Sequence, residues 1–228
     1  MNRTLSVIRM QFVNRQTYVW IPLIILAGSF VLSLLIFALI PTDAPKYGGA
    51  AQAPLWYLLA VGIQAMTMSF PFSQAMSVTR REFYVGALLT AGIAALVLVA
   101  VYVLGGFVEQ LTGGWGMNGW YFYLPWIWEA GPLGAGLFYF VMAVLLFIIG
   151  FWSATIYKRF GGVGLTIVLV GIGLALVGLL WLVGRMDAWG FVWEWLMSAG
   201  AMGLTAWAAV VAVLLAGIAF LTLRRTVP

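Results

Sequence analysis

The chain has 228 residues, of which 64% are hydrophobic and only 7% are charged, and its mean hydropathy is +1.08. Soluble domains carry about 25% charged residues, so the composition excludes an ordinary soluble domain and indicates an integral membrane protein. We interpret the net charge of +5 as an orientation signal, because the basic residues stand between apolar runs. We do not interpret it as a nucleic-acid footprint.

The chain has neither Cys nor His. Their absence excludes thiolate chemistry, imidazole bases and most transition-metal sites. The sequence also lacks the G-x-x-x-x-G-K-[ST] phosphate loop, and no charged residue lies in the middle of a predicted span, which disfavours an ion-coupled carrier. We therefore expect no catalytic, cofactor-binding or metal-binding residue in this chain, and no enzymatic activity of its own.

Residues 1–17 are polar and basic, and they form the first predicted segment. Leu5, Ile8 and Phe12 follow an i, i+3, i+7 spacing, which predicts a short amphipathic helix on the cytoplasmic membrane surface. The alternative is a disordered basic tail.

Residues 18–228 form one predicted transmembrane domain of six helices, since apolar runs of about 20 residues can cross a hydrocarbon core as helices. The predicted spans cover residues 18–40, 54–76, 83–108, 133–156, 163–183 and 199–223. Pro22 lies in the first turns of the first span, where a missing amide matters least. Pro71 is expected to kink the second span or to loosen its last turns.

The second span is the most polar of the six. Gln64 needs a partner in hydrocarbon, so its amide is expected to face protein or a watery cavity. A hydrogen bond between helices is favoured over a substrate contact. The fifth span is rich in glycine, which predicts close packing or a subunit contact.

Two outer segments are rich in aromatic residues. The stretch from Glu109 to Pro132 is predicted to form an outer cap, with a short interfacial helix around Tyr121–Glu129, and an aromatic belt is favoured over a ligand cage. Residues 185–198 are predicted to form a broken hairpin that re-enters the outer leaflet before the last span. Gly200 and Gly203 suit the bend.

The basic residues divide unequally between the two sides of the predicted topology. One side holds Arg3, Arg9, Arg15, Arg80, Arg81, Lys158, Arg159, Arg224 and Arg225, whereas the other holds only Lys46 and Arg185. Basic residues mark the cytoplasmic face. The sequence therefore predicts a multi-pass protein of the cell membrane with both termini in the cytoplasm.

A short charged loop joins the second and third spans and reads Ser77-Val78-Thr79-Arg80-Arg81-Glu82-Phe83-Tyr84. Thr79 and Glu82 have the spacing of a capping box, so a helix is expected to start here. Two interpretations remain open at this point. The loop is either an ordinary cytoplasmic turn or a docking element for a cytoplasmic partner.

With this topology, the loop resembles the membrane subunit of a type-2 ABC exporter. Members of that family have an N-terminal amphipathic connecting helix and six spans. Their loop after the second span often contains Gly or Ser followed by Val-Ser/Thr-Arg-Arg-Glu/Asp-Phe, which Ser77–Phe83 matches. A broken outer hairpin before the last span is also typical of the family.

The resemblance implies that the loop couples the permease to a separate ATP-binding subunit, which holds the ATP and Mg. The coupling residues would be Thr79, Arg80, Arg81, Glu82, Phe83 and Tyr84. A second permease subunit, identical or homologous, would enclose a central path. The second and fifth helices line that path in the family, so Gln64, Thr67, Met68 and Ser69 are candidates for its lining.

The sequence thus favours a permease subunit of an ATP-driven exporter. Its aromatic, apolar character suits an amphiphilic or hydrophobic substrate. The alternative is a membrane protein that does not transport, such as a self-immunity or signalling factor. A third interpretation, an intramembrane enzyme or ion-coupled carrier, would require a catalytic or coupling residue that the sequence lacks.

Overall fold

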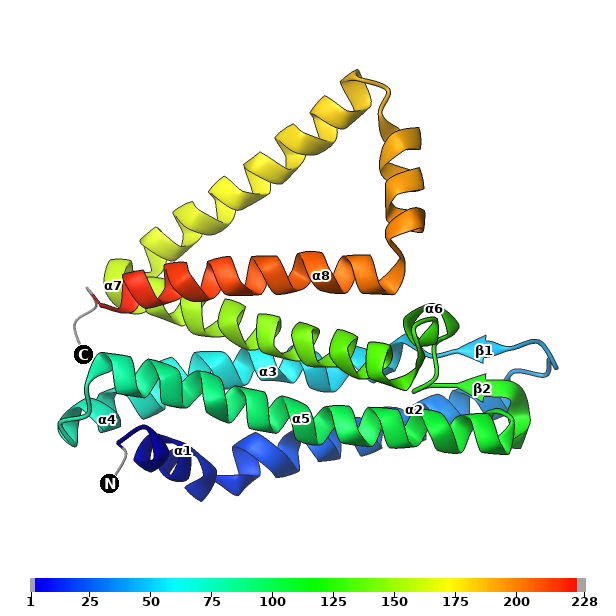
Figure 1. Cartoon of the computed structure of the whole chain (residues 1–228), viewed down its shortest axis with the longest axis horizontal. Helices are drawn as coiled ribbons and strands as arrows, with labels where there is room; N and C mark the ends of the chain where they lie inside the picture. The colour runs from blue at the N-terminus through cyan, green and yellow to red at the C-terminus, as the bar shows by residue number, and fades with distance from the viewer. Residues whose placement is uncertain (1–2, 225–228) are drawn as a thin grey trace.

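The computed structural model describes residues 3–224, and the protein is almost entirely helical (Figure 1). The helices are α1 (Arg3–Val13), α2 (Ile21–Leu39), α3 (Ala53–Gln64), α4 (Phe70–Ala75), α5 (Arg80–Thr112), α6 (Pro125–Trp128), α7 (Gly131–Arg185) and α8 (Trp189–Leu223). Short π-helical or 3-10 turns are η1 (Gln16–Trp20), η2 (Gly49–Gln52), η3 (Ala65–Ser69) and η4 (Gly114–Asn118). The predicted all-α fold class is confirmed. Arg225, which the sequence assigns to the cytoplasmic side, lies outside the described residues.

Five helical segments are long and apolar enough to cross a membrane, as an α-helical membrane protein requires. They are Gln16–Leu39, Gly49–Ala75, Arg80–Thr112, Gly131–Arg185 and Trp189–Leu223. The number is one lower than the number of predicted spans, because α7 joins the fourth and fifth of them in 55 residues. Between these two predicted spans, α7 is interrupted only at Gly161, with φ 74° and ψ −175°.

The bundle is densest where α3 meets α7. A Cβ atom at Gly62 would lie 2.2 Å from the main-chain oxygen of Phe147, and one at Gly150 would lie 2.0 Å from that of Leu59. Glycine is therefore required on both helices for their backbones to approach this closely. Figure 1 shows α2, α3, α5, the first half of α7 and the later part of α8 running along one common axis.

The second half of α7 leaves this bundle. In Figure 1 it forms one side of a triangle, which the start of α8 and the returning part of α8 complete. No residue from 161 to 200 is buried. The break before the last span falls at Gly200, where φ is 57° and ψ is −168°, and glycine adopts this conformation without steric cost.

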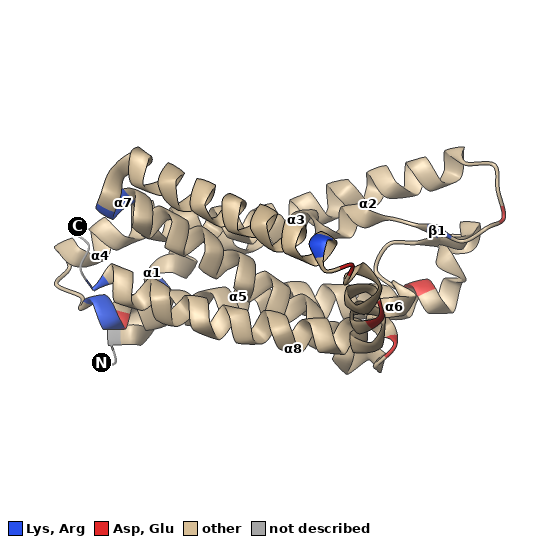
Figure 2. Cartoon of the chain, turned by 90° about the horizontal axis from the view of Figure 1, so that it is seen from above, with Lys and Arg blue, Asp and Glu red and all other residues tan. Residues whose placement is uncertain are grey.

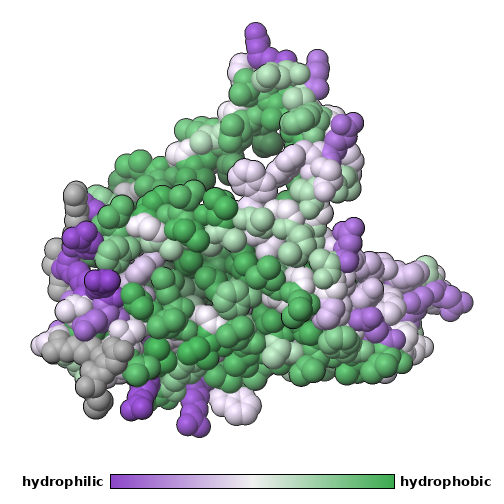
Figure 3. Space-filling view, in the orientation of Figure 1, coloured by the Kyte–Doolittle hydropathy of each residue, from purple (hydrophilic) through white to green (hydrophobic). Residues whose placement is uncertain are grey.

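Charge is concentrated at the two ends of the bundle. Most Lys and Arg residues lie at the end that holds both chain ends and α4, whereas most Asp and Glu residues lie toward the opposite end, near α6 (Figure 2). Between them, the surface in Figure 3 is mainly apolar. The loops that follow α2 and α5 meet through the parallel pair of short strands β1 (Lys46–Tyr47) and β2 (Gly119–Trp120).

Helix α1 packs on α5 with a face centred on Val7 and Gln11, and of its predicted apolar stripe Phe12 also packs against the core. Val7 and Gln11 are buried, and a Cβ atom at Gly86 of α5 would lie 2.6 Å from Val7 Cγ1. Leu5, by contrast, is 53% exposed. One face of the helix therefore packs against the bundle, whereas Leu5 lies on an exposed face that a membrane surface can contact.

Candidate functional site

The turn between α4 and α5 has a defined backbone geometry. The Ser77 amide donates to the Gln74 carbonyl oxygen at 3.0 Å, and the Val78 amide donates to the Ser73 carbonyl oxygen at 3.1 Å. This pair of bonds is the Schellman pattern that ends a helix, and it places Ser77 in the left-handed region at φ 57°. Glycine adopts this conformation without steric cost, and Ser77 takes it here at a position where glycine would fit.

A complete capping box starts α5, so the predicted one is confirmed. The Glu82 amide donates to Thr79 Oγ1 at 3.3 Å, and the Thr79 amide donates to Glu82 Oε2 at 3.0 Å. The Thr79 hydroxyl also donates to Glu82 Oε2 at 2.7 Å. The side chain of Glu82 is therefore engaged in fixing the helix start.

Phe83 and Tyr84, which the resemblance assigns to the docking surface, are both buried. The Phe83 ring lies 5.2 Å from that of Phe70, and the Tyr84 ring lies 5.3 Å from that of Phe220. The Tyr84 hydroxyl donates to the main-chain oxygen of Ala216 at 2.6 Å. In this structure the two side chains anchor the turn on the bundle, and the accessible surface of the turn lies at residues 77–82.

The two arginines of the turn differ in their surroundings. Arg80 Nη1 donates to the main-chain oxygen of Arg224, 2.5 Å away, beyond the end of α8. Arg81 is exposed. Both line a hollow of about 620 Å³, together with Phe220 and Arg224. Arg81 is thus the cationic side chain of the turn that is most open to a partner.

The candidate path residues lie on or beside the π-helical turn η3. This turn ends two residues before Pro71, and η1 likewise ends two residues before Pro22. A proline clashes with the carbonyl group four residues earlier, and the wider π-helical turn relieves that clash. The loosened helix that the sequence predicts at Pro71 therefore takes the form of a π-helical turn, a feature found frequently at functional sites.

The four candidate path residues do not form one pocket among themselves. Met68 is 70% exposed, Thr67 donates to the Ile63 carbonyl oxygen at 2.9 Å, and Gln64 is half-buried. The side chains of Ser69 and Tyr18 lie close enough to interact. The two π-helical turns therefore meet through this pair, a contact that the sequence does not signal.

Glu109 marks the other end of α5, and sequence reasoning missed its role. The sequence places Glu109 in the outer loop, but α5 continues to Thr112 and the Glu109 side chain is fully buried. Its Oε1 accepts from Trp115 Nε1 and from the Tyr121 amide, at 2.8 and 2.9 Å. Its Oε2 accepts from the amides of Phe122 and Tyr123. This carboxylate is buried because four donors satisfy it.

The loop after α5, which the sequence predicts as an outer cap, is built around Tyr121. Its hydroxyl lies 2.6 Å from Ser29 Oγ of α2. Burial raises the pKa of Tyr121 above its ordinary value, the hydrogen bond to Ser29 opposes that rise, and the charge of Glu109 adds to it. Tyr121 therefore stays protonated at neutral pH. The helix predicted around residues 121–129 is shorter than expected, since α6 spans only Pro125–Trp128.

Comparison of the chain with protein-family models, curated proteins and solved structures gives no match. The description of the site therefore rests on its own geometry. Within residues 3–224, no three Asp or Glu side chains gather in a way that would hold a metal ion. What the structure offers is an all-α protein with helices of membrane length and a capped, basic turn fixed to the last helix.

Proposed function

We propose that the chain is the permease subunit of an ATP-driven exporter of the type-2 ABC kind. A separate ATP-binding subunit docks on the turn at residues 77–82 and supplies the energy. One observation carries this proposal. The turn is capped at both helix ends, and Tyr84, next to it in the chain, is hydrogen-bonded to Ala216 of α8.

The turn before α5 must be stiff if it is to transmit a displacement from the ATP-binding subunit to the helices. The Schellman pattern at Ser77 and the capping box at Thr79 each fix one end of the turn, and buried aromatic rings hold Phe83 and Tyr84. A partner that pushes on Arg81 would therefore move α4, α5 and α8 together. Coupling of this kind is carried by packed side chains and rigid helices.

The proposed topology has six spans with both termini in the cytoplasm. The interruption at Gly161 supports it, because it divides α7 into segments 131–160 and 162–185. A helix of about 20 residues suffices to cross the hydrocarbon core, so each segment is long enough. The arm of α8 before Gly200 is the proposed re-entrant element on the outer side.

A second permease subunit completes the proposed transporter. The helix at residues 162–185 buries no residue within its own chain, which supports a role against a partner helix. The proposed path runs along the second span, where Gln64 and Met68 lie near the π-helical turn. An apolar, aromatic surface of this kind suits an amphiphilic or hydrophobic substrate.

The test is co-purification from the native membrane followed by an ATPase assay. The tagged chain is expected to retain an ATP-binding subunit that the variant Arg81→Glu loses. Arg9→Glu is the matched control, because it reverses the charge of another exposed arginine outside the turn. A chain that purifies alone without nucleotide turnover would instead support a non-transporting membrane protein.

A further inference from the structure

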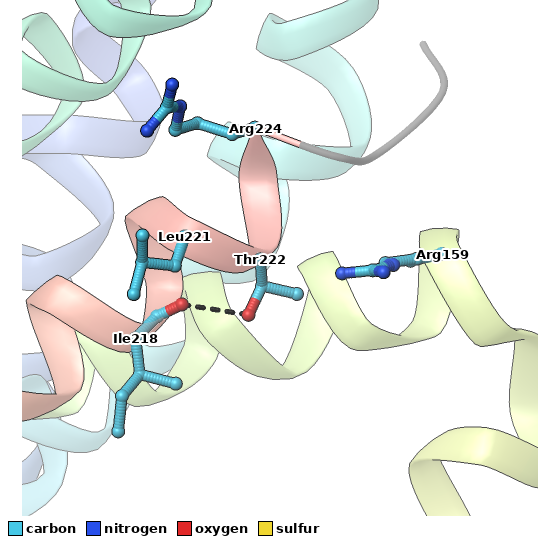
Figure 4. A pocket seen from close by; sticks show the side chains of 5 residues that line it. All are labelled: Arg159, Ile218, Leu221, Thr222 and Arg224. Carbon is cyan, nitrogen blue, oxygen red and sulfur yellow. Dashed lines mark hydrogen bonds between the residues drawn. The ribbon is translucent and has the colours of Figure 1, made fainter.

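Four arginines surround two adjoining hollows at the end of the bundle that holds both chain ends. One hollow, of about 560 Å³, is lined by Arg159, Ile218, Leu221, Thr222 and Arg224 (Figure 4). The other is the hollow lined by Arg80, Arg81, Phe220 and Arg224. Arg224 lines both. We call this pair of hollows the arginine basin.

The arginines come from three parts of the chain that the fold brings together. Arg80 is held by its bond to the Arg224 main-chain oxygen. The guanidinium of Arg159, on α7, lies 4.6 Å from the centre of the Phe160 ring, and that of Arg224 lies 5.9 Å from the centre of the Phe220 ring. In Figure 4 Arg159 points toward the end of α8, whereas Arg224 points away from it.

The lining of the basin is basic and apolar at once. Among the residues that the structure describes, no acidic side chain lines either hollow, and the arginines share the walls with Ile218, Leu221 and Phe220. Basic side chains that line adjoining hollows with no acidic side chain among them favour a bound anion. The apolar walls favour an anion that also carries hydrocarbon.

The apolar walls are continuous with the long apolar surface of α8. Ile218 and Leu221 are 48% and 61% exposed, on a helix long and apolar enough to span a membrane. A soluble phosphate would leave these side chains unused. A lipid would place its phosphate among the guanidinium groups and its acyl chains along α8.

We propose that the arginine basin binds the headgroup of an anionic phospholipid from the cytoplasmic leaflet. Basic pockets between membrane helices on this side suit such headgroups, and guanidinium groups bind phosphate oxygens with two parallel hydrogen bonds. The lipid would bridge the turn before α5, the break in α7 and the end of α8. This inference goes beyond transport and does not depend on an ATP-binding partner.

Native mass spectrometry of the full chain in detergent tests the proposal, with phosphatidylglycerol and phosphatidylcholine offered as competing probes. The wild-type chain is expected to retain phosphatidylglycerol. The double variant Arg159→Gln/Arg224→Gln is expected to weaken that binding about tenfold or more, because each basic residue near the headgroup contributes substantially to the attraction. The control Arg9→Gln/Arg15→Gln removes the same charge from exposed positions of the N-terminal segment and should change little.

Three results would overturn the proposal. The first is equal retention of both lipids by the wild-type chain, which needs no variant and so holds even if the double variant folds poorly. The second is an equal loss of binding in the basin variant and in the control. The third is displacement of the lipid by millimolar glycerol phosphate, which would identify a soluble phosphate as the ligand.

Discussion

The Tyr84 hydroxyl donates a hydrogen bond of 2.6 Å to the main-chain oxygen of Ala216, 132 residues further along the chain. The bond joins the first turn of α5 to α8. The rings of Tyr84 and Phe220 pack beside it, 5.3 Å apart. A displacement of the turn before α5 therefore reaches the last helix through Tyr84, in addition to the bond from Arg80 to the main-chain oxygen of Arg224.

Tyr84→Phe tests this link, because it keeps the ring and removes only the hydroxyl donor. A hydrogen bond of this kind contributes about 1 kcal/mol, so we expect a small loss of stability and a transport rate reduced severalfold. Transport into vesicles measures the rate. Tyr157→Phe, at an exposed position near the same end of the bundle, is the control. Equal rates for Tyr84→Phe and the wild type would exclude this bond from coupling.

Thr79→Ala removes the hydroxyl of the capping box. Loss of an N-cap residue costs about 1 kcal/mol, and the turn before α5 should become more mobile. Thr79→Ser keeps the hydroxyl and is expected to behave like the wild type. Hydrogen exchange at residues 77–84 measures the difference. Similar exchange rates in the two variants would show that the box does not stiffen the turn.

Glu109→Gln places an amide nitrogen where a carboxylate oxygen accepts two hydrogen bonds. Either orientation of the amide sets its NH₂ group against two donors of the outer cap. Leaving buried donors unsatisfied costs about 2 kcal/mol. We expect a lower midpoint of thermal unfolding and faster proteolysis within residues 113–124.

The control for this change is Glu194→Gln, because Glu194 is exposed. It should leave both the unfolding midpoint and the proteolysis rate near those of the wild type. If Glu109→Gln behaved in the same way, the buried carboxylate would not be what holds the outer cap.

Gly62→Ala and Gly150→Ala each add a methyl group at the contact between α3 and α7. The new Cβ atom would lie only 2.2 or 2.0 Å from a main-chain oxygen of the facing helix, so the two helices must separate. We expect either variant to lose folded yield in detergent. Gly171→Ala meets no atom within 4 Å and should be tolerated. If Gly171→Ala lost folded yield while Gly62→Ala and Gly150→Ala kept it, close packing of α3 on α7 would not explain the glycines.

The sequence predicts what is local and misses what depends on distant partners. The capping box is predictable because Thr79 and Glu82 are three residues apart. The role of Glu109 is not, because its donors follow 12 to 14 residues later and meet it only when the outer cap folds back. The apolar character of Phe83 likewise does not reveal whether its ring faces a partner or Phe70.

Interruptions of the helices are likewise only partly predictable from the sequence. Pro22 and Pro71 are visible in the sequence, but the π-helical turns before them depend on how each helix accommodates the ring. The gap between the predicted fourth and fifth spans, at residues 157–162, predicts a turn, and the helical backbone of α7 is interrupted there at Gly161 alone.

Site-specific cross-linking tests the coupling proposal most directly, since the chain has no cysteine. Arg81→Cys introduces a single thiol on the exposed part of the turn, and Leu111→Cys introduces one at the opposite end of α5, where Leu111 is 86% exposed. In native membranes, a short bifunctional reagent should join only the Arg81→Cys chain to a protein that mass spectrometry identifies as an ATP-binding subunit. No adduct at residue 81, or the same adducts at both positions, would contradict the proposal that an ATPase docks on this turn.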